Sequence, residues 1–218
     1  MSTRAERDGR ALEREWWLRV PMLLQSPRAV FAALRDDSDE AAGARQEPLV
    51  AVAFLAGISI FLSTGTAGHV FDDAEIRDDA LLLVVQAVFA GALVALQNVW
   101  IIGAAVYFGA RGLGSEGRYR RARHLVGFAT VPFVLSLVLV WPVRIAIYGG
   151  DLFRSGGSDD GAGGDVFRGI DAAFLAWAAG LLVLGVRTVN DWHWLRSLAA
   201  LGLAALVFAA LAVLFVVF

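Results

Sequence analysis

The sequence predicts an all-α, polytopic integral membrane protein, a helix bundle with five transmembrane helices. Hydrophobic residues make up 58% of the 218 residues, and the mean hydropathy of +0.62 exceeds what a soluble domain of this length can bury. Five apolar segments are each close to or above the roughly 17 to 25 residues that a spanning helix needs. They cover residues 48–65, 80–110, 125–147, 170–186 and 194–218. So many apolar helices in a short chain leave no polar segments to surround them in water.

The distribution of arginine orients these helices. All 19 basic residues are arginine, and most lie in residues 1–47, 111–123 and 187–196, which alternation of the spans places on one side. Arg77, Arg154 and Arg168 lie in the loops on the other side. Because arginine-rich loops remain in the cytoplasm, we expect a cytoplasmic N-terminus and an outside C-terminus.

The stretch from Arg118 to Tyr148 is the strongest single signal, because arginines run directly into a long apolar segment. They hold their end of the helix in the cytoplasm, and we predict that they form a surface for lipids or partners. Within the helix, Pro132 and Pro142 each remove a backbone donor and are expected to kink it. The arginines of this cluster are Arg118, Arg120, Arg121 and Arg123.

Residues 1–47 form the predicted cytoplasmic N-terminal region, which begins with a charged tail. Trp16 and Trp17 open an apolar run too short to span, and such residues suit the headgroup layer. Ser26 and Pro27 predict a helix start, with serine as the cap and proline in the first turn. We expect residues 27–35 to form a short amphipathic helix, either on the membrane surface or packed on the protein's own cytoplasmic face. A polar linker, residues 36–47, is expected to follow.

The second span and the outer loops have distinctive lengths and compositions. At about 1.5 Å per residue, a helix over residues 80–110 is about 46 Å long, which exceeds a hydrocarbon core of about 30 Å. It must tilt, break near Gly103 or project into the cytoplasm. The loops of residues 68–79 and 149–169 are acidic or glycine-rich, and we expect both outside the membrane, the second as a flexible loop.

Few polar residues fall inside the predicted spans, and their cost at membrane depth makes them informative. Gln86, Gln97 and Asn98 lie in the second span, where they most simply bond to neighbouring helices. A substrate path lined by them is the alternative. Arg144 lies near the outer end of the third span, so it can either snorkel to the headgroups or pair with Asp171.

Small residues recur at four-residue steps in two spans, a spacing that favours close approach of helices. They are Ala87, Gly91 and Ala95 in the second span, and Ala172, Ala176 and Gly180 in the fourth.

Catalytic and metal chemistry finds little support in the sequence. The absence of cysteine excludes disulfides, thiolate metal sites and cysteine nucleophiles. His69, His124 and His193 lie in separate segments, so we predict no metal site. No phosphate loop, dinucleotide fingerprint or nucleophile elbow is present. We therefore expect neither catalytic residues nor a cofactor, and a membrane-embedded enzyme is the least supported class.

Three segments of the chain form a recognisable set: LLQSPRAVFAALRD (23–36), YRRARHLVGFATVPFVLSLVL (119–139) and WAAGLLVLGVRTVNDW (177–192). Together they resemble the prokaryotic branch of the Yip family, five-span membrane proteins named for interaction with Ypt/Rab GTPases. The resemblance implies a cytoplasmic N-terminus, five helices and no catalytic machinery. The chain lacks the long N-terminal region that could engage a GTPase, which argues against a Rab-type partner. The family-motif positions are Ser26, Pro27, Gly127, Pro132, Gly185, Val186 and Arg187.

Two functional hypotheses follow. The leading one is a non-enzymatic protein of the plasma membrane that organises membrane or recruits partners through its arginine-rich cytoplasmic face, flanked by Trp16 and Trp17. Its expected partners are anionic lipids, then other membrane proteins or further copies of itself, and no nucleic acid. The alternative is a small oligomeric transporter or channel with a polar path through the second and third spans, lined by Gln86, Gln97, Asn98 and Arg144.

Overall fold

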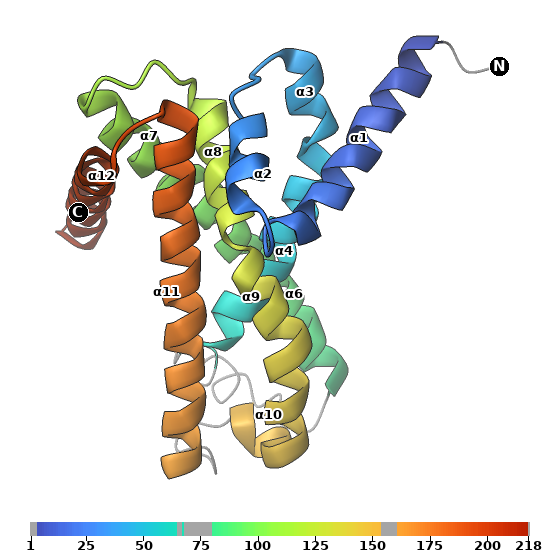
Figure 1. Ribbon diagram of the computed structural model, residues 1–218. Coiled ribbons are helices and arrows are strands. Elements are labelled where there is room, and N and C mark those ends of the chain that lie inside the picture. The colour runs from blue at the N-terminus through green and yellow to red at the C-terminus, as the bar shows by residue number, and fades with distance from the viewer. Residues whose placement is uncertain (1–3, 65–66, 68–79, 154–160, 218) are drawn as a thin grey trace. The chain divides into compact units, whose positions relative to one another are not determined.

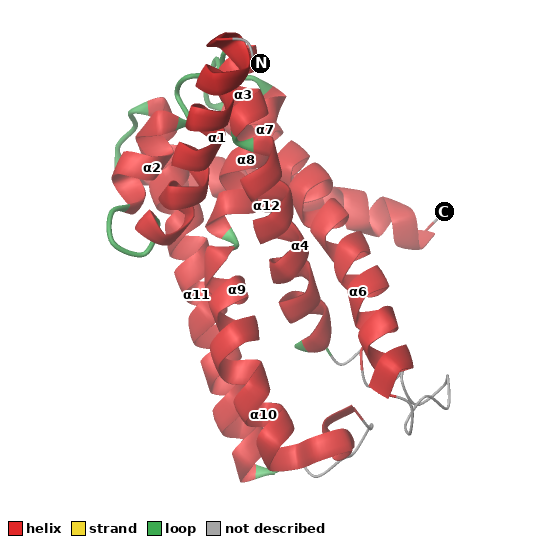
Figure 2. Ribbon diagram, turned by 90° about the vertical axis from the view of Figure 1, so that its right-hand side faces the viewer, coloured by secondary structure: helices red, strands yellow, loops and turns green. Residues whose placement is uncertain are grey.

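The structure is a computed structural model that describes residues 4–64, 67, 80–153 and 161–217. Every secondary-structure element among these residues is a helix (Figures 1 and 2), which confirms the all-α class. Contacts divide the chain into two compact units. Unit 1 comprises Met1–Val52, Gln97–Ala129 and Ala179–Phe218, and unit 2 comprises Ala53–Leu96 and Thr130–Ala178.

Unit 1 contains the N-terminal helices and most of the arginines. Its whole elements are α1 (Arg4–Met22), α2 (Pro27–Ala33), α3 (Asp39–Ala44), η1 (Asn98–Ile102), α7 (Gly103–Gly112), α8 (Tyr119–Ala129) and α12 (Trp194–Val217). It also contains the first residues of α4 (Gln46–Leu62) and the last turns of α11 (Ala162–Asn190). The core of this unit includes Phe31, Leu34 and Phe128, each fully buried.

Unit 2 contains the remaining lengths of α4 and α11. Its other elements are α6 (Ala80–Gln97), α9 (Val131–Leu135), η2 (Ser136–Val140), α10 (Trp141–Tyr148) and the 3-10 turn η3 (Gly149–Phe153). One small apolar cluster joins Phe61 and Ala67 to Ala90 and Val94 of α6.

Within the described part of the chain, four helical stretches are long and apolar enough to cross a membrane. They are Asp39–Leu62, Val84–Gly112, Tyr119–Tyr148 and Ala162–Asn190, and each overlaps one of the first four predicted spans. A shorter apolar stretch, Trp194–Ala210, lies within α12. The fifth span and the sidedness of all five remain predictions.

One expectation for the N-terminal region is wrong. The charged tail is largely helical, since α1 begins at Arg4, and a helix there does not contradict the prediction from sequence. Residues 36–47 are not a linker, because they contain α3 and the start of α4. Ser38 explains α3, since its side chain accepts a hydrogen bond from the backbone N–H of Ala41 at 3.3 Å, and acidic residues in the first turn favour a helix N-terminus.

The helix start at Pro27 is confirmed, with one difference. Ser26 occupies the N-cap position, but its side chain makes no capping bond. Proline in the first turn is the remaining local signal, and its fixed φ suits that position. Burial of Val30 and Phe31 then holds this short helix in place.

The second span is interrupted by a π-helical turn, not by a break. The backbone N–H of Gly103 bonds to the carbonyl of Asn98, five residues earlier, and the chain continues as α7. A Cβ at Gly103 would lie 3.2 Å from the Cα of Arg123, so glycine here permits a close approach to α8.

The third span is irregular at both prolines, as predicted. Thr130 separates α8 from α9, which has Pro132 in its first turn. The π-helical turn η2 then precedes α10, which has Pro142 in its first turn.

Close packing of small residues is confirmed in α6. A Cβ on Gly91 would lie 2.8 Å from the Cα of Ile58, and a Cβ on Gly57 would lie 2.8 Å from the backbone nitrogen of Ala95. The backbones of α4 and α6 therefore meet at these glycines. The same prediction is wrong for α11 within the described residues, because a Cβ on Gly180 would meet nothing within 4 Å, and Ala172 and Ala176 are exposed.

The outer loops lie partly outside the described residues. Residues 68–79, with His69, and residues 154–160 are among those not described. The fourth helix begins earlier than expected, at Ala162. Asp165 in its first turn is favourable at a helix N-terminus.

Candidate functional site

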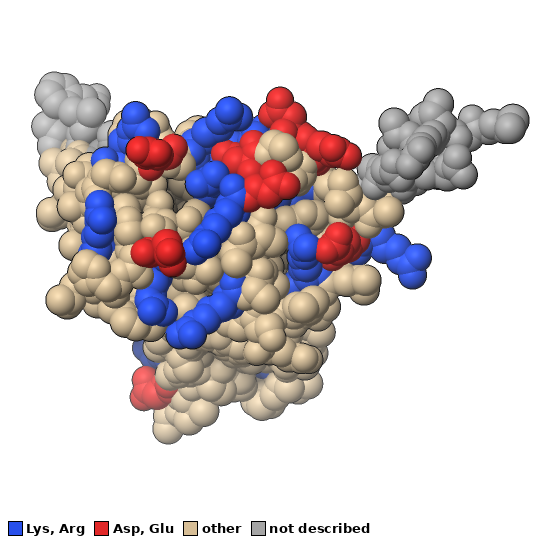
Figure 3. Space-filling view, turned by 45° about the horizontal axis from the view of Figure 1, so that its top comes forward, with Lys and Arg blue, Asp and Glu red and all other residues tan. Residues whose placement is uncertain are grey.

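Arginine and acidic side chains are interspersed on the face shown in Figure 3. The predicted arginine-rich surface therefore carries both signs of charge. Which arginines remain available to a ligand depends on which already have partners within unit 1.

Arg120 is bound to the segment that leads into α3. Its Nε donates to Oδ1 of Asp37 at 3.1 Å, its Nη1 donates to Oδ1 of Asp39 at 2.7 Å, and its Nη2 donates to the carbonyl of Asp37 at 2.6 Å. Nearby, the backbone N–H of Ser38 donates to Oδ1 of Asp36 at 3.0 Å. This bond to the charged form lowers the pKa of the Asp36 carboxyl.

Arg45 lies at the centre of this cluster and has no exposed surface. Its Nε donates to Nδ1 of His124 at 2.7 Å, its Nη1 to the carbonyl of Asp36 at 2.8 Å, and its Nη2 to Oδ1 of Asp37 at 3.3 Å. Since Nδ1 of His124 accepts, this imidazole must be neutral with its proton on Nε2. The Asp37 side chain, 7% exposed, is shared by Arg45 and Arg120.

Trp16 belongs to the same buried region. Its ring stacks on Phe128 with centroids 5.5 Å apart and planes 20° apart, and it is 3% exposed. The guanidinium carbons of Arg19 and Arg45 lie 4.7 Å and 5.6 Å from its ring centroid, within the range of a cation–π contact. The structure thus places Trp16 inside unit 1, whereas Trp17 is 41% exposed.

Arg121 and Arg35 connect α2, α8 and the end of α11. Nη2 of Arg121 donates to the carbonyl of Arg35 at 3.0 Å. Nε of Arg35 donates to the carbonyl of Thr188 at 3.0 Å, and its Nη2 lies 3.4 Å from Oδ1 of Asp191. A cation at a helix C-terminus satisfies carbonyls that have no partner within the helix. Arg35 therefore caps α11 from outside that helix.

Arg123 packs against aromatic rings. Its guanidinium lies 4.1 Å from the ring centroid of Trp100 and 5.2 Å from that of Tyr119. The hydroxyl of Tyr119 donates to the carbonyl of Trp100 at 2.7 Å. Arg123, like Arg120 and Arg121, is thus held by contacts within unit 1.

The junction between α11 and α12 also uses arginines. Arg187 lies over the ring of Trp194 at 4.8 Å, and Arg196 lies over that of Trp192 at 4.4 Å. Nε of Arg196 also donates to the carbonyl of Leu113, at the end of α7, at 3.2 Å. These contacts fix the end of α7 to the start of α12.

The side chains of four exposed arginines make no hydrogen bond, ion pair or ring contact among the described residues. They are Arg14, Arg28, Arg111 and Arg118. Of the predicted cluster, only Arg118 belongs to this group.

The family-motif glycines lie at close contacts in unit 1. A Cβ on Gly127 would collide with the side chain of Leu49, and one on Gly185 would lie 3.1 Å from Leu125 and 3.3 Å from Phe31. Pro132, in unit 2, is fully buried. Gly127, Gly185 and Pro132 thus lie in closely packed surroundings, and this packing explains their residue types without reference to a ligand.

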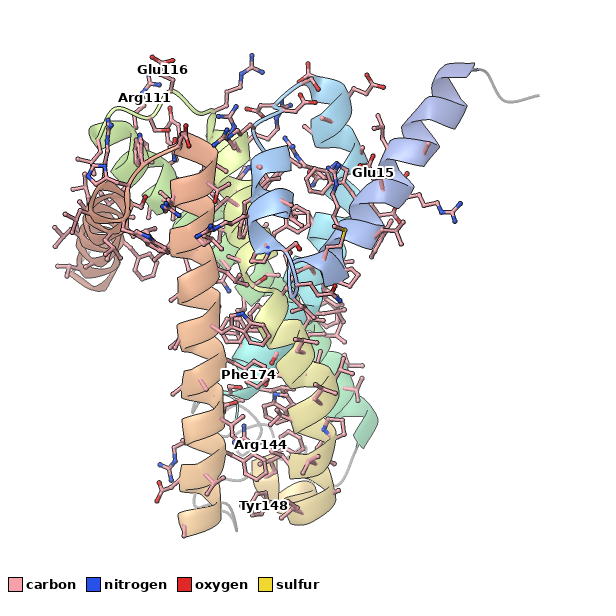
Figure 4. All side chains as sticks on the ribbon, viewed as in Figure 1. Glu15, Arg111, Glu116, Arg144, Tyr148 and Phe174 are labelled. Carbon is pink, nitrogen blue, oxygen red and sulfur yellow. The ribbon has the colours of Figure 1, made fainter. Side chains whose placement is uncertain are left out.

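The polar residues of the spans do not form one described network. Arg144 is 7% exposed and its Nη1 donates to Oδ2 of Asp171 at 3.0 Å, so it pairs with Asp171 rather than snorkelling. Its guanidinium also lies over Trp141 at 4.7 Å and Phe167 at 5.1 Å; Figure 4 shows Arg144 from α10. Within unit 2, no described hydrogen bond joins Arg144 to Gln86, and Gln97 and Asn98 belong to unit 1.

Sequence reasoning missed Arg45, Asp37 and His124 as a buried group. A signal was present, because the acidic run Asp36–Asp39 complements the arginines of 118–123 in charge. That complementarity did not show which arginine would be buried. The position of Arg45 just before an apolar run suggested a solvated linker.

These features define the class of protein. A chain whose described secondary-structure elements are all helices, with four helical stretches long and apolar enough to cross a membrane, is a polytopic helical membrane protein. The Yip1 domain family matches residues 22–218, which is most of the chain. The protein therefore belongs to the Yip1 family, whose members are generally non-enzymatic membrane proteins. No curated protein and no solved structure shows a match to this chain.

Proposed function

We propose that this protein organises membrane by binding anionic lipid headgroups at a cytoplasmic face of unit 1 and recruits partners there. The observation that carries the proposal is the group of exposed arginines without described partners, Arg14, Arg28, Arg111 and Arg118. An unpaired guanidinium near an anionic membrane surface contributes about 1 kcal/mol of attraction. A guanidinium already held by carboxylates has less to gain from a lipid.

The proposal divides the predicted arginine cluster into two roles. Arg120, Arg121 and Arg123 have partners inside unit 1 and hold α8 against α2, α3 and η1. Arg118 is exposed and available. The lipid-binding group therefore consists of Arg118 together with arginines from α1, α2 and α7.

The exposed side of α1 supports an interfacial position for this helix. Trp17, Leu18 and Met22 are 41%, 60% and 44% exposed. Arg14 precedes Trp17 and Leu18 by three and four residues, which places all of them on one side of a helix. Apolar and aromatic residues beside arginine suit the boundary between headgroups and acyl chains.

We further propose that the N-terminus is cytoplasmic, that α12 is the fifth span and that Phe218 lies outside. The distribution of arginine supports this orientation. With the resemblance to the prokaryotic branch, it suggests the plasma membrane as the location. Lateral partners, another membrane protein or a second copy, remain predictions.

The test is lipid retention measured by native mass spectrometry on the full chain. The protein is reconstituted in nanodiscs of phosphatidylcholine with phosphatidylglycerol, and the lipids that stay bound after release are counted. Combined Arg14→Gln, Arg28→Gln, Arg111→Gln and Arg118→Gln should reduce retained phosphatidylglycerol at least fivefold, since 1 kcal/mol is about a factor of five.

The control is Arg168→Gln, an exposed arginine of α11 that pairs only with Asp165 three residues earlier. It should leave lipid retention unchanged. If the wild-type protein showed no preference for phosphatidylglycerol over phosphatidylcholine, the proposed function would be wrong.

A further inference from the structure

A small pocket opens in unit 1 between the ends of α7 and α11 and the start of α8. Its volume is about 30 Å³, which is room for two or three water molecules. The lining residues are Val106, Tyr107, Ala110, Ser115, Gly117, Arg118, Arg121, Ala122, Leu125, Val186, Val189 and Asn190. We call this the α8 pocket.

The charge of the α8 pocket is one-sided. Arg118 and Arg121 both line it, and no acidic residue does. Glu116 lies in the same loop but is exposed and outside the lining; Figure 4 shows it with Arg111 at the end of α7 and the loop that follows. Two guanidiniums without a carboxylate favour an anion.

Each of these arginines has donors to spare. The Arg118 side chain is exposed and makes no hydrogen bond or ion pair among the described residues. After the hydrogen bond from Arg120, its charge also helps to lower the pKa of the Asp39 carboxyl. Arg121 uses Nη2 for the carbonyl of Arg35, and its Nε is buried with no partner in the described structure. A buried N–H without an acceptor is costly, by roughly 1 to 3 kcal/mol. A bound anion would remove that cost.

The rim of the α8 pocket is held by hydrogen bonds. The hydroxyl of Ser115 donates to Oδ1 of Asn190 at 2.6 Å, and Nδ2 of Asn190 donates to the carbonyl of Val186 at 2.9 Å. The N–H of Gly117 donates to Oγ of Ser115 at 3.3 Å. This loop is thus tied to α11, so the two sides of the pocket have fixed positions.

Carbonyl groups near the pocket are already occupied by other arginines. The ends of α7 and α11 carry partial negative charge, which would repel an anion. Arg196 binds the carbonyl of Leu113, and Arg35 binds that of Thr188. These two cations reduce the repulsion and add positive charge around the site.

The floor of the pocket is apolar, formed by side chains such as Val106, Leu125 and Val186. An apolar floor excludes water and strengthens the attraction between a guanidinium and an anion at the mouth. The pocket is too small for a ring or an acyl chain. It suits one compact anionic group held at its opening.

We propose that the α8 pocket binds one phosphate group through Arg118 and Arg121, from a phospholipid headgroup or from a soluble phosphate ester. Planar guanidiniums recognise phosphate oxygens in pairs, which explains the use of arginine at both positions. The inference rests on the proposed function, since it assigns one defined headgroup site within the lipid-binding face.

The experiment uses the full chain in nanodiscs of phosphatidylcholine alone, to which phosphatidic acid, phosphatidylglycerol or soluble glycerol phosphate is added. Bound molecules are counted by native mass spectrometry. Combined Arg118→Gln and Arg121→Gln should weaken binding of the added anionic lipid or glycerol phosphate by about tenfold or more, as expected for charged hydrogen bonds. The control, Arg168→Gln, removes one charge at an exposed arginine of α11 that belongs neither to the pocket nor to the lipid-binding group, and should change binding less than about twofold.

Because Arg121 also holds α2, two more variants keep the result interpretable. Arg118→Gln alone, at an exposed side chain with no hydrogen bond or ion pair among the described residues, should still weaken binding severalfold. Arg121→Lys keeps the charge but not the planar fork, and should bind less than the wild type while melting at a similar temperature.

The outcomes separate the pocket from the proposed function. If glycerol phosphate binds in neutral nanodiscs and anionic lipids do not, the pocket is supported with a soluble ligand, and the proposed lipid function fails. If anionic lipid is retained by the pocket variant and lost when Arg14→Gln, Arg28→Gln and Arg111→Gln are combined, the pocket proposal is wrong while the function stands. If neither soluble nor lipid phosphate binds the wild type, both are wrong.

Discussion

Nε of Arg45 donates to Nδ1 of His124 at 2.7 Å, although 79 positions separate the two residues. Both side chains are fully buried. The bond joins the residue before α4 to α8, and thus the beginnings of the first and third predicted spans within unit 1. The Arg45 guanidinium is positively charged and the His124 ring is neutral. The negative charge that balances Arg45 therefore comes from Asp37, which Arg45 shares with Arg120.

Arg45→Met should therefore destabilise the protein by about 3 to 5 kcal/mol, as is typical when one partner of a buried ion pair is removed. His124→Lys should be at least as damaging, because it places a second cation beside Arg45. His124→Gln can offer Arg45 a carbonyl acceptor and should cost less. Tryptophan fluorescence during denaturant unfolding in detergent measures these changes. Arg118→Met is the exposed control, and an Arg45→Met protein as stable as this control would contradict the prediction.

The adjacent tryptophans should respond differently to truncation. Trp16→Ala removes a buried ring that stacks on Phe128 and should cost about 3 to 5 kcal/mol, while α1 should become sensitive to trypsin at Arg14 and Arg19. Trp17→Ala leaves the core intact, so stability in detergent should change little, within about 0.5 kcal/mol. Equal losses of stability for the two variants would show that α1 does not pack as described.

Glycine packing between α4 and α6 gives a second matched pair. Gly57→Ala and Gly91→Ala each place a methyl group against backbone atoms, which should cost about 1 to 3 kcal/mol through overpacking. Gly180→Ala has open space around it and should be neutral or stabilise by up to about 1 kcal/mol through helix propensity. Thermal unfolding followed by circular dichroism distinguishes the two groups. A harmless Gly57→Ala would exclude the close approach.

The Arg144 and Asp171 pair predicts non-additive effects. Asp171→Asn should destabilise by about 3 to 5 kcal/mol because it leaves a buried guanidinium without a counter-charge. The double variant Arg144→Met with Asp171→Leu should recover much of that loss, since apolar pairs often replace buried ion pairs at little cost. The four proteins form a double-mutant cycle in chemical denaturation. If Arg144 instead snorkelled, Asp171→Asn would have no effect.

The proposed orientation predicts that a reporter protein gives opposite signals when fused to the N-terminus and to the C-terminus. A fluorescent protein that matures only in the cytoplasm should be bright when fused before Met1 and dark when fused after Phe218. An alkaline phosphatase fusion, active only outside, should give the reverse pattern. Bright fluorescence at both ends would place both termini in the cytoplasm and remove α12 as a fifth span. Charge reversal of Arg168, on the predicted outer side, serves as the control and should leave both patterns unchanged.

The apolar helices could be predicted from the sequence because membrane burial is a property of long segments. Hydropathy over a whole segment located the first four spans within several residues of the observed helices. The irregularities at Gly103, Pro132 and Pro142 were also predictable, since they follow from local backbone chemistry. The boundary at Ala162 was missed because glycine-rich composition outweighed the favourable position of Asp165.

The contacts of unit 1 were less predictable, because each depends on which distant segment comes near. Trp16 and Trp17 have the same residue type and neighbours in sequence, yet only Trp16 reaches Phe128. The four arginines of 118–123 likewise share a residue type but not a place in the fold. Arg118 precedes α8 and is exposed, whereas α8 directs Arg120 toward Asp37 and Arg123 toward Trp100. Counting charges located the arginine cluster but could not show which of its members pair within unit 1 and which stays exposed.

The π-helical turn η2 holds one more residue than an α-helical turn. Trp141 donates its backbone N–H to the carbonyl of Ser136, five residues earlier, whereas an α-helix joins residues four apart. Removing Val138 would let the same two groups bond in an ordinary α-helical turn, so Arg144 should still face Asp171. Removing Val143 from the regular helix α10 would instead turn Arg144 by about 100° and break its ion pair. A one-residue deletion is therefore tolerated at η2 and harmful a few residues later.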